Sequence, residues 1–220
     1  MTREEIIEAF RLECPEITER VVTDPLLHVW CKQGNREVCA EARCIVDKDG
    51  TTISTSENDQ KWDLTREITN FYDIDDYPGG GVTYNSKRLT EKTMAQLDEE
   101  SITWRNRSSG TPKAYYRRGK WLWLDRAIDS NADDVTIYSV LLPDDFDDDD
   151  KTPYNELTYL KPFHYAIVKY LEWKAKQKIG KREDSMKAHA EFLDFIKWMK
   201  KQLGGGKYAP IHFRPRIYPS

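Results

Sequence analysis

Several signatures that commonly mark an enzyme are missing from this chain of 220 residues. It has no Walker loop, no GxGxxG, no GxSxG turn and no HExxH metal motif. None of its 4 histidines has a partner at a catalytic spacing; they are His28, His164, His189 and His212. We therefore expect a protein that is not an enzyme and that uses no cofactor or metal.

Cysteines and long apolar runs are also scarce. The 4 cysteines are Cys14, Cys31, Cys39 and Cys44, and their spacings form no CxxC pair. Free cysteines usually behave as small buried hydrophobes, so zinc and disulfides are not expected. No stretch reaches the roughly 18 apolar residues of a membrane span, and the N-terminus lacks the apolar core of a secretion signal. We expect a soluble protein made in a cytoplasm, without membrane contact.

The composition nevertheless predicts a folded chain. Charged residues make up 33% and the mean hydropathy is −0.77, yet the chain holds 7 Trp, 12 Tyr and 7 Phe, too many rings for a disordered polymer. Charge is unevenly placed: residues 151–220 hold 15 Lys or Arg against 6 Asp or Glu, and residues 1–150 hold 19 against 32. Opposite charge in the two parts of the chain suits head-to-tail pairing of subunits. Helices rich in Lys and loops rich in Asp would produce the same uneven distribution of charge.

Helical patterns occupy both ends of the sequence. Thr2 and Glu5 form a capping-box pattern that predicts a helix over 2–12, and Thr23-Asp24-Pro25 predicts a second helix over 24–43. We expect a kink at Gly34, although glycine also lets another helix approach closely. Near the other end we expect a helix from 155 or 156 to 179 with a break near Pro162, and a last helix over 182–203.

Short strand patterns fill the middle of the chain. We expect a hairpin in which 44–46 and 51–55 flank the turn Asp49-Gly50, and a second hairpin in which Gly119 joins 114–117 to 121–124. Further strands are expected over 68–74 and 135–141, with a short helix over 90–97. Pro78-Gly79-Gly80-Gly81 predicts a loop, and self-repulsion is expected to keep the acidic run 144–150 extended and solvated.

The end of the chain is a different kind of segment. Three glycines, 204–206, precede a stretch rich in proline, arginine and aromatics that can form no core of its own. We expect this arm to dock on a partner, or to fold back on its own domain. The candidate docking residues are Tyr208, Ile211, His212, Phe213, Arg214, Arg216, Ile217 and Tyr218.

These patterns together predict the fold class α+β. N- and C-terminal helices would flank an inserted β-rich domain and be followed by an extended C-terminal arm. The expected boundaries are 1–43 for the N-terminal helices, 44–143 for the β-rich domain, 144–153 for an acidic linker, 154–203 for the C-terminal helices and 204–220 for the arm.

Two functions fit parts of the sequence: nucleic-acid binding and metal-dependent hydrolysis. Trp104-Arg105-Asn106-Arg107 and Tyr115-Tyr116-Arg117-Arg118 interleave rings with cations, which together with the C-terminal lysines is typical of a nucleic-acid-binding accessory protein. A metal-dependent hydrolase would use the aspartates Asp73, Asp75, Asp76 and Asp147, but the first three also fit the exposed face and turn of a strand.

The order of the parts resembles the head-to-tail adaptor, or connector, proteins of tailed bacteriophages. N-terminal helices, a β-rich insertion and C-terminal helices follow one another, and local phrases occur in that order across most of the chain. The phrases are Thr23-Asp24-Pro25-Leu26-Leu27, then Gly110-Thr111-Pro112-Lys113-Ala114-Tyr115-Tyr116, then Pro162-Phe163-His164-Tyr165-Ala166-Ile167-Val168-Lys169-Tyr170, followed by Gly180-Lys181 and Phe192.

The resemblance implies a structural virion protein of the phage neck, in which the N- and C-terminal helices form a helical bundle. Such a protein forms a homo-oligomeric ring, commonly a dodecamer, beneath the portal, extends the DNA channel with passive contact to DNA, and receives a stopper, tail-tube or nozzle protein. The arm would then be the portal-binding segment. Lys187, Lys197, Lys200 and Lys201 of the last helix would face the channel or a neighbouring subunit.

Overall fold

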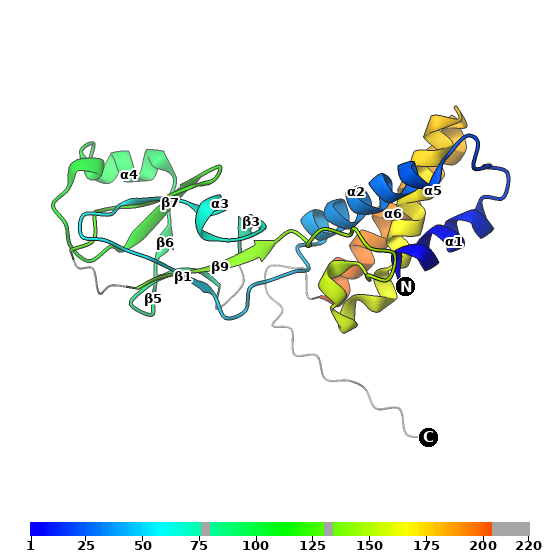
Figure 1. Ribbon diagram of the computed structural model, residues 1–220. Coiled ribbons are helices and arrows are strands. Elements are labelled where there is room, and N and C mark those ends of the chain that lie inside the picture. Colours follow the sequence, from blue (N-terminus) through cyan, green and yellow to red (C-terminus); the bar gives the residue numbers. More distant parts are fainter. Residues whose placement is uncertain (76–79, 130–133, 204–220) are drawn as a thin grey trace, which may run out of the picture. The chain divides into compact units, whose positions relative to one another are not determined.

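The computed structural model describes residues 1–75, 80–129 and 134–203. It is 45% helical and 18% strand, so the expected α+β class is confirmed. The chain divides into two compact units. Met1–Ile45 and the chain from Leu142 onward form the first, here called the helical unit, and Val46–Leu141 form the second, here called the β unit (Figure 1).

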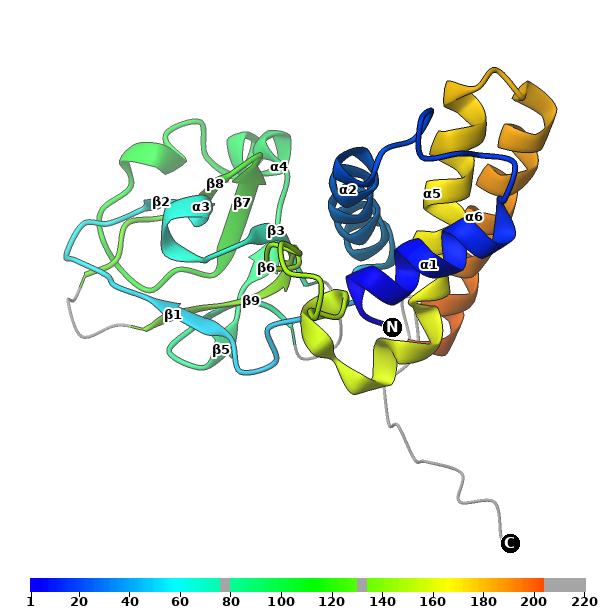
Figure 2. The ribbon, with the colours of Figure 1, turned by 45° about the vertical axis from the view of Figure 1, so that its right-hand side comes forward.

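Four α-helices make up most of the helical unit: α1 (Arg3–Glu13), α2 (Asp24–Ala42), α5 (Tyr165–Lys178) and α6 (Arg182–Gln202). The capping box is present, because the Thr2 hydroxyl accepts from the Glu5 amide and the Glu5 carboxylate accepts from the Thr2 amide. The helices predicted over 2–12, 24–43 and 182–203 are thus confirmed to within a residue or two. Figure 2 shows α5 and α6 running side by side.

Helix α5 is the central helix of this unit, because α1, α2 and α6 all pack against it. Its apolar residues are buried around most of its circumference rather than along one stripe; they are Ala166, Ile167, Val168, Leu171 and Ala175. The ammonium group of Lys169 ties the outer helices together, lying 3.0 Å from Glu13 of α1 and 3.1 Å from Glu191 of α6. Charge pairing therefore supplements apolar packing at this end of α5.

The expected kink at Gly34 is wrong. Helix α2 is continuous from Asp24 to Ala42, and Gly34 is buried against α5. A Cβ atom at Gly34 would lie 2.9 Å from Cδ1 of Tyr170, closer than carbon atoms approach one another. The glycine therefore allows close approach of two helices, the alternative that the sequence had left open.

The long C-terminal helix predicted from residue 155 or 156 is also wrong in its first part. Two 3-10 turns, Tyr154–Glu156 and Thr158–Phe163, precede α5. Asn155 has a left-handed backbone, with φ of 52°, and Pro162 supplies no amide hydrogen. Both features oppose an α-helix, which starts only at Tyr165.

The acidic run is held to the helices instead of being merely solvated. The Phe146 side chain is buried, and the Lys32 ammonium lies 2.9 Å from Asp145 and 3.3 Å from Asp147. Arg3 donates to the Phe146 carbonyl at 3.0 Å and to the Asp149 carboxylate at 2.7 Å. Hydrogen bonds from Lys32 and Arg3 lower the pKa values of Asp145 and Asp149. These aspartates remain largely exposed, as expected, but the segment is a strap across α1 and α2.

Two sheets enclose the core of the β unit. In the first, β9 (Val135–Leu141) pairs with β1 (Thr51–Ile53), β3 (Phe71–Ile74) and β4 (Gly81–Tyr84), and β4 pairs with β5 (Lys87–Arg88). The second has the order β2 (Lys61–Asp63), β8 (Trp121–Leu124), β7 (Ala114–Arg118) and β6 (Thr90–Glu91). Leu64, Val82, Leu122, Leu124 and Ile137 are fully buried in the core.

Three short helices complete this unit: α3 (Leu64–Glu67), α4 (Met94–Glu100) and the 3-10 turn Trp104–Asn106. Helix α4 begins at a Thr93 capping box, so the helix expected over 90–97 lies later in the chain, and Thr90–Glu91 is a strand. The strand expected over 68–74 begins only at Phe71, because α3 occupies 64–67 and Asn70 turns with φ of 56°.

One predicted hairpin is present and the other is not. Antiparallel pairing of β7 with β8 around Gly119, whose φ is 59°, confirms the second hairpin, and strand 135–141 is also confirmed. The first hairpin is wrong, because Val46 bridges Val140 and Thr51 pairs with Ile137. Both sides of the Asp49-Gly50 turn thus pair with β9 instead of with each other. Of the predicted loop 78–81, Gly81 begins β4, and 78–79 lie outside the described residues.

Replacing Gly34 with alanine tests the close approach of α2 and α5. In an open helix this change stabilises by about 1 kcal/mol, whereas here the new methyl group collides with Tyr170. We expect a net loss of roughly 1–3 kcal/mol in unfolding free energy from overpacking, measured by urea denaturation. The control is Gln33→Ala on the exposed side of α2, expected to change stability by less than about 0.5 kcal/mol. A stabilised G34A protein would contradict the contact.

His164 makes stability depend on pH. Its side chain is buried against Tyr154, and Nδ1 lies 2.7 Å from the amine of Met1. Burial, aided by the positive amine, lowers the pKa of His164 from 6.5 to about 4. The unfolded chain therefore takes up this proton at a higher pH than the folded chain.

The stability due to neutral His164 is fully present above the unfolded pKa and is lost as pH falls through the folded value of about 4. Between pH 7 and pH 4 the wild type should lose roughly 2–3 kcal/mol more unfolding free energy than His164→Phe, which cannot titrate. Urea denaturation at a series of pH values measures how the unfolding free energy of each protein falls with pH. The carboxylates titrate in both proteins and contribute equally to the two slopes. Parallel slopes would show that His164 is not held neutral.

Candidate functional site

The eight residues predicted to dock on a portal cannot be placed. Tyr208, Ile211, His212, Phe213, Arg214, Arg216, Ile217 and Tyr218 all lie outside the described residues. The described part of the chain ends at Leu203, one residue after the end of α6. The candidate surfaces that it does describe are two helix faces of the helical unit and one sheet face of the β unit.

The lysines predicted for channel or subunit contact lie on the outer side of α6. Lys187, Lys197 and Lys201 are exposed; Lys197 pairs with Asp194 at 2.8 Å, and Lys200 lies 3.6 Å from Glu41 of α2. Two large apolar side chains share this side of the helix, Met186 at 67% exposed and Leu193 at 39%. These two side chains add apolar area to an otherwise polar helix face.

The outer side of α1 has the opposite charge. Glu4 and Glu8, at successive turns, are exposed and are followed by Leu12, which is 81% exposed. The basic residues of α1 point elsewhere, because Arg3 is buried under the acidic strap and Arg11 bonds to Asp24 at 3.0 Å. The helical unit thus carries an acidic face on its first helix and a basic face on its last, each with exposed leucine.

The rings proposed for nucleic-acid stacking are mostly not at the surface. Trp104 is 1% exposed and its indole nitrogen donates to Asp98 at 2.8 Å, while Tyr115 is 4% exposed within the core of the β unit. Only Tyr116 of the interleaved rings lies on the outer face of its strand. Alternation along a strand explains this, because neighbouring side chains point to opposite faces.

The same alternation creates a surface that the sequence interpretation missed. On β8, Leu122 and Leu124 face the core, so Trp121 and Trp123 face outward. Strand register places Lys61 of β2 and Tyr116 of β7 on either side of Trp123, and Arg118 beside Trp121. The pattern Trp-Leu-Trp-Leu was the available signal, but the strands that flank it are set by tertiary pairing.

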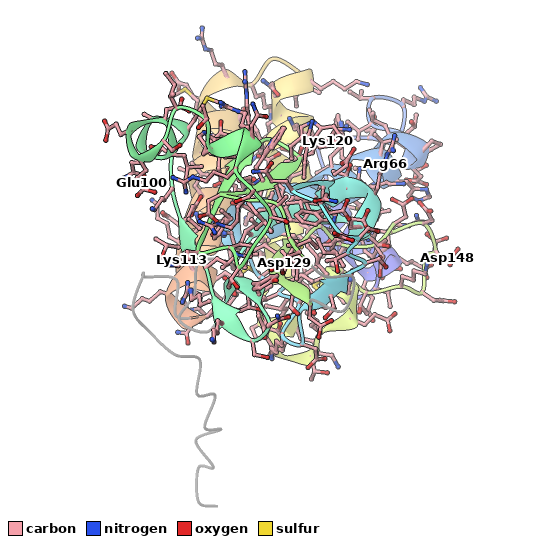
Figure 3. All side chains as sticks on the ribbon, turned by 90° about the vertical axis from the view of Figure 1, so that its left-hand side faces the viewer. Arg66, Glu100, Lys113, Lys120, Asp129 and Asp148 are labelled. Carbon is pink, nitrogen blue, oxygen red and sulfur yellow. The ribbon has the colours of Figure 1, made fainter. Side chains whose placement is uncertain are left out.

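These residues border a hollow of about 510 Å³ on the outer face of the second sheet. We call it the aromatic–cation groove; it is lined by Lys61, Met94, Trp104, Arg105, Tyr116, Arg118, Gly119, Lys120, Trp121 and Trp123. Trp104 closes one end, where it meets Trp123 edge to face at 6.2 Å. Figure 3 labels Lys120, which lies on the same side of the β unit as Arg66.

Cations cover the aromatic faces of the groove. The ammonium of Lys61 lies 3.9 Å from the ring centre of Trp121 and 4.6 Å from that of Trp123, within the range of cation–π attraction. Arg105 stands 4.5 Å from the Trp104 ring. Lys120 binds Asp63 at 2.7 Å, and this hydrogen bond lowers the pKa of the Asp63 carboxyl. The groove is therefore a positively charged surface on an aromatic floor.

The aspartates proposed for a metal hydrolase have other partners. Asp73 forms an ion pair with Arg117, and Asp147 pairs with Lys32. Asp75 is buried and Asp76 lies outside the described residues. Across residues 1–75, 80–129 and 134–203, no three His, Cys, Asp or Glu side chains gather as a metal site would need.

The cysteines and His189 are packed inside the helical unit or against its aromatic rings. All four cysteines are free and buried, as expected, and burial raises the pKa of Cys14 to about 11 and of Cys31 to about 12. His189 stacks on Trp173 with ring centres 4.0 Å apart. Thiols with pKa values this high are poor nucleophiles at neutral pH.

No protein-family model matches this chain, and no curated protein does. In the described part of the chain, no helix is both long and apolar enough to cross a membrane.

Two tryptophans on one strand should differ in their structural roles. Trp123 packs on the small cluster of Leu97, Trp104 and Ala114, whereas the Trp121 ring contacts two lysine ammonium groups. We expect Trp123→Ala to cost about 2–4 kcal/mol of unfolding free energy and Trp121→Ala less than about 1 kcal/mol. Urea denaturation of both variants measures this difference, and equal losses would mean that Trp121 is part of the core.

Proposed function

We propose that this protein is a head-to-tail adaptor of a tailed phage, a structural virion protein that forms a ring at the portal vertex. The observation that carries the proposal is the interleaved organisation of the chain. Helices from both ends of the chain belong to one unit, and the β unit is inserted between them. This matches the order of parts on which the resemblance to the adaptor family rests. We take the helical unit as the bundle of such an adaptor.

The two charged helix faces support lateral contact between neighbouring copies. The acidic face of α1 and the basic face of α6 are different surfaces of one unit, so their contact joins copies head to tail. A head-to-tail contact that closes on itself gives a ring, and the family implies twelve subunits. Leu12 on one face and Met186 and Leu193 on the other supply apolar area that a neighbour would cover.

The C-terminal arm is assigned to the portal. It follows α6 after three glycines, and its apolar rings and arginines suit docking on another protein. A ring in this place extends the DNA channel, contacts DNA only passively and receives a stopper, tail-tube or nozzle protein on its far side. The protein would be made in the host cytoplasm and end in the virion neck.

Charge reversal on the two helix faces tests the proposed ring. Lys187→Glu/Lys197→Glu/Lys201→Glu and, separately, Glu4→Lys/Glu8→Lys should each weaken self-association at least about tenfold, because like charges would meet across the contact. Combining both sets should restore the ring. Sedimentation velocity measures the assembly of each variant, alone and with a candidate portal protein.

The control for the triple lysine variant is Lys48→Glu/Lys87→Glu/Lys113→Glu, which makes the same change of net charge on exposed residues of the β unit. It should assemble as the wild type does. Rings that survive reversal of either helix face, or a combined variant that stays monomeric while each single set assembles, would contradict lateral contact through α1 and α6.

A further inference from the structure

Within the described residues, the aromatic–cation groove holds more cations than carboxylate partners. Lys120 pairs with Asp63 at 2.7 Å, and Arg105 lies 3.5 Å from Asp98. Lys61 and Arg118, in contrast, have no carboxylate within 4.0 Å in the described part of the chain. Lys61 and Arg118, which line a hollow of about 510 Å³, are therefore suited to bind an anionic partner.

The arrangement of the rings favours carboxylates over nucleic-acid bases as that partner. A base would have to displace the Lys61 ammonium from the face of Trp121, where it lies 3.9 Å from the ring centre. The β unit as a whole also has an acidic excess, with 13 Lys or Arg against 17 Asp or Glu in residues 46–141, which repels a polyanion at long range. A short acidic peptide can pair with the Lys61 ammonium where it lies, and it carries fewer charges than a long nucleic acid, so it meets less long-range repulsion; the Arg118 guanidinium also matches carboxylate geometry.

The chain itself contains an acidic segment with unused charge. In the strap at 144–150, Asp145, Asp147 and Asp149 pair with Lys32 or Arg3 but keep more than half of their side-chain surface exposed. The side chain of Asp148 is 73% exposed and lies 3.6 Å from the Lys151 ammonium, and Asp150 is exposed. Figure 3 labels Asp148, whose side chain points away from the helical unit.

We propose that the aromatic–cation groove binds the acidic strap, residues 144–150, of a second copy of this chain. Lys61 and Arg118 receive the carboxylates of Asp148 and Asp150, and the tryptophans hold Lys61 in place. As a contact between neighbouring subunits the inference rests on the proposed ring. Binding of the strap by the groove is nevertheless measurable without a ring.

The test uses the full chain and a fluorescein-labelled peptide of residues 144–151, which contains six of the chain's aspartates. We expect saturable binding by fluorescence anisotropy, weakened by added salt and accompanied by a change in tryptophan emission. Lys61→Glu/Arg118→Glu should bind at least about tenfold more weakly. Lys87→Glu, an exposed site in the other sheet, is the control and should bind as the wild type does.

A peptide with all six aspartates replaced by asparagine should lose binding, because the carboxylates are the recognised groups. Absence of binding, or equal binding by Lys61→Glu/Arg118→Glu, would overturn the proposal whether or not the wild type forms a ring. An oligothymidine that displaces the peptide and binds more tightly would also overturn it, in favour of nucleic acid. Ring formation by sedimentation judges the adaptor function separately, so the two failures are distinguishable.

Discussion

The close approach of α2 to α5 at Gly34 is the contact on which the helical unit depends. Because Gly34 has no side chain, α2 packs directly against the Tyr170 ring of α5. This contact helps to bury α5 around most of its circumference. Tyr170 then packs edge to face with Phe192 of α6 at 5.4 Å, which links the second helix to the last through α5. Segments more than 100 residues apart are joined in this way, although the β unit is inserted between them in the sequence.

Charge pairs complete this arrangement at its surface. Lys169 bridges α1 and α6, Arg3 fixes the acidic strap to α1, and Lys32 fixes it to α2. The strap thereby follows the helices and leaves Asp148 and Asp150 facing solvent. Acidic charge therefore gathers near the start of α1, whereas the last turn of α6 is basic.

Local signals in the sequence predicted most elements that carry their own start or stop residue. The Thr2 capping box, the Thr23-Asp24-Pro25 start and the Gly119 turn each act within a few residues, so no tertiary information was needed. The expected Asp49-Gly50 hairpin failed because β9 offers a longer partner to both flanking segments. Likewise, apolar spacing alone favoured a longer C-terminal helix, but the left-handed Asn155 and Pro162 prevent an α-helix before Tyr165.

The candidate surfaces were predictable only in part, for a related reason. The exposed lysines of α6 could be predicted, because the helical spacing of apolar residues is visible in the local sequence and places the lysines on the opposite face. The groove does not, because Trp121, Lys61 and Arg118 come from three strands whose register is set by pairing across the sheet. Trp104 and Tyr115 looked available for stacking, but α4 and the core of the β unit enclose them.

The central claim is that this chain assembles as the ring of a phage neck, and the mass of its assembly tests that claim most directly. Mass photometry of the full chain, alone and mixed with a candidate portal protein, measures it. The account predicts a discrete ring, or a single chain of 25.9 kDa that joins the portal in a complex of ring stoichiometry. A protein that stays monomeric and indifferent to the portal would contradict it.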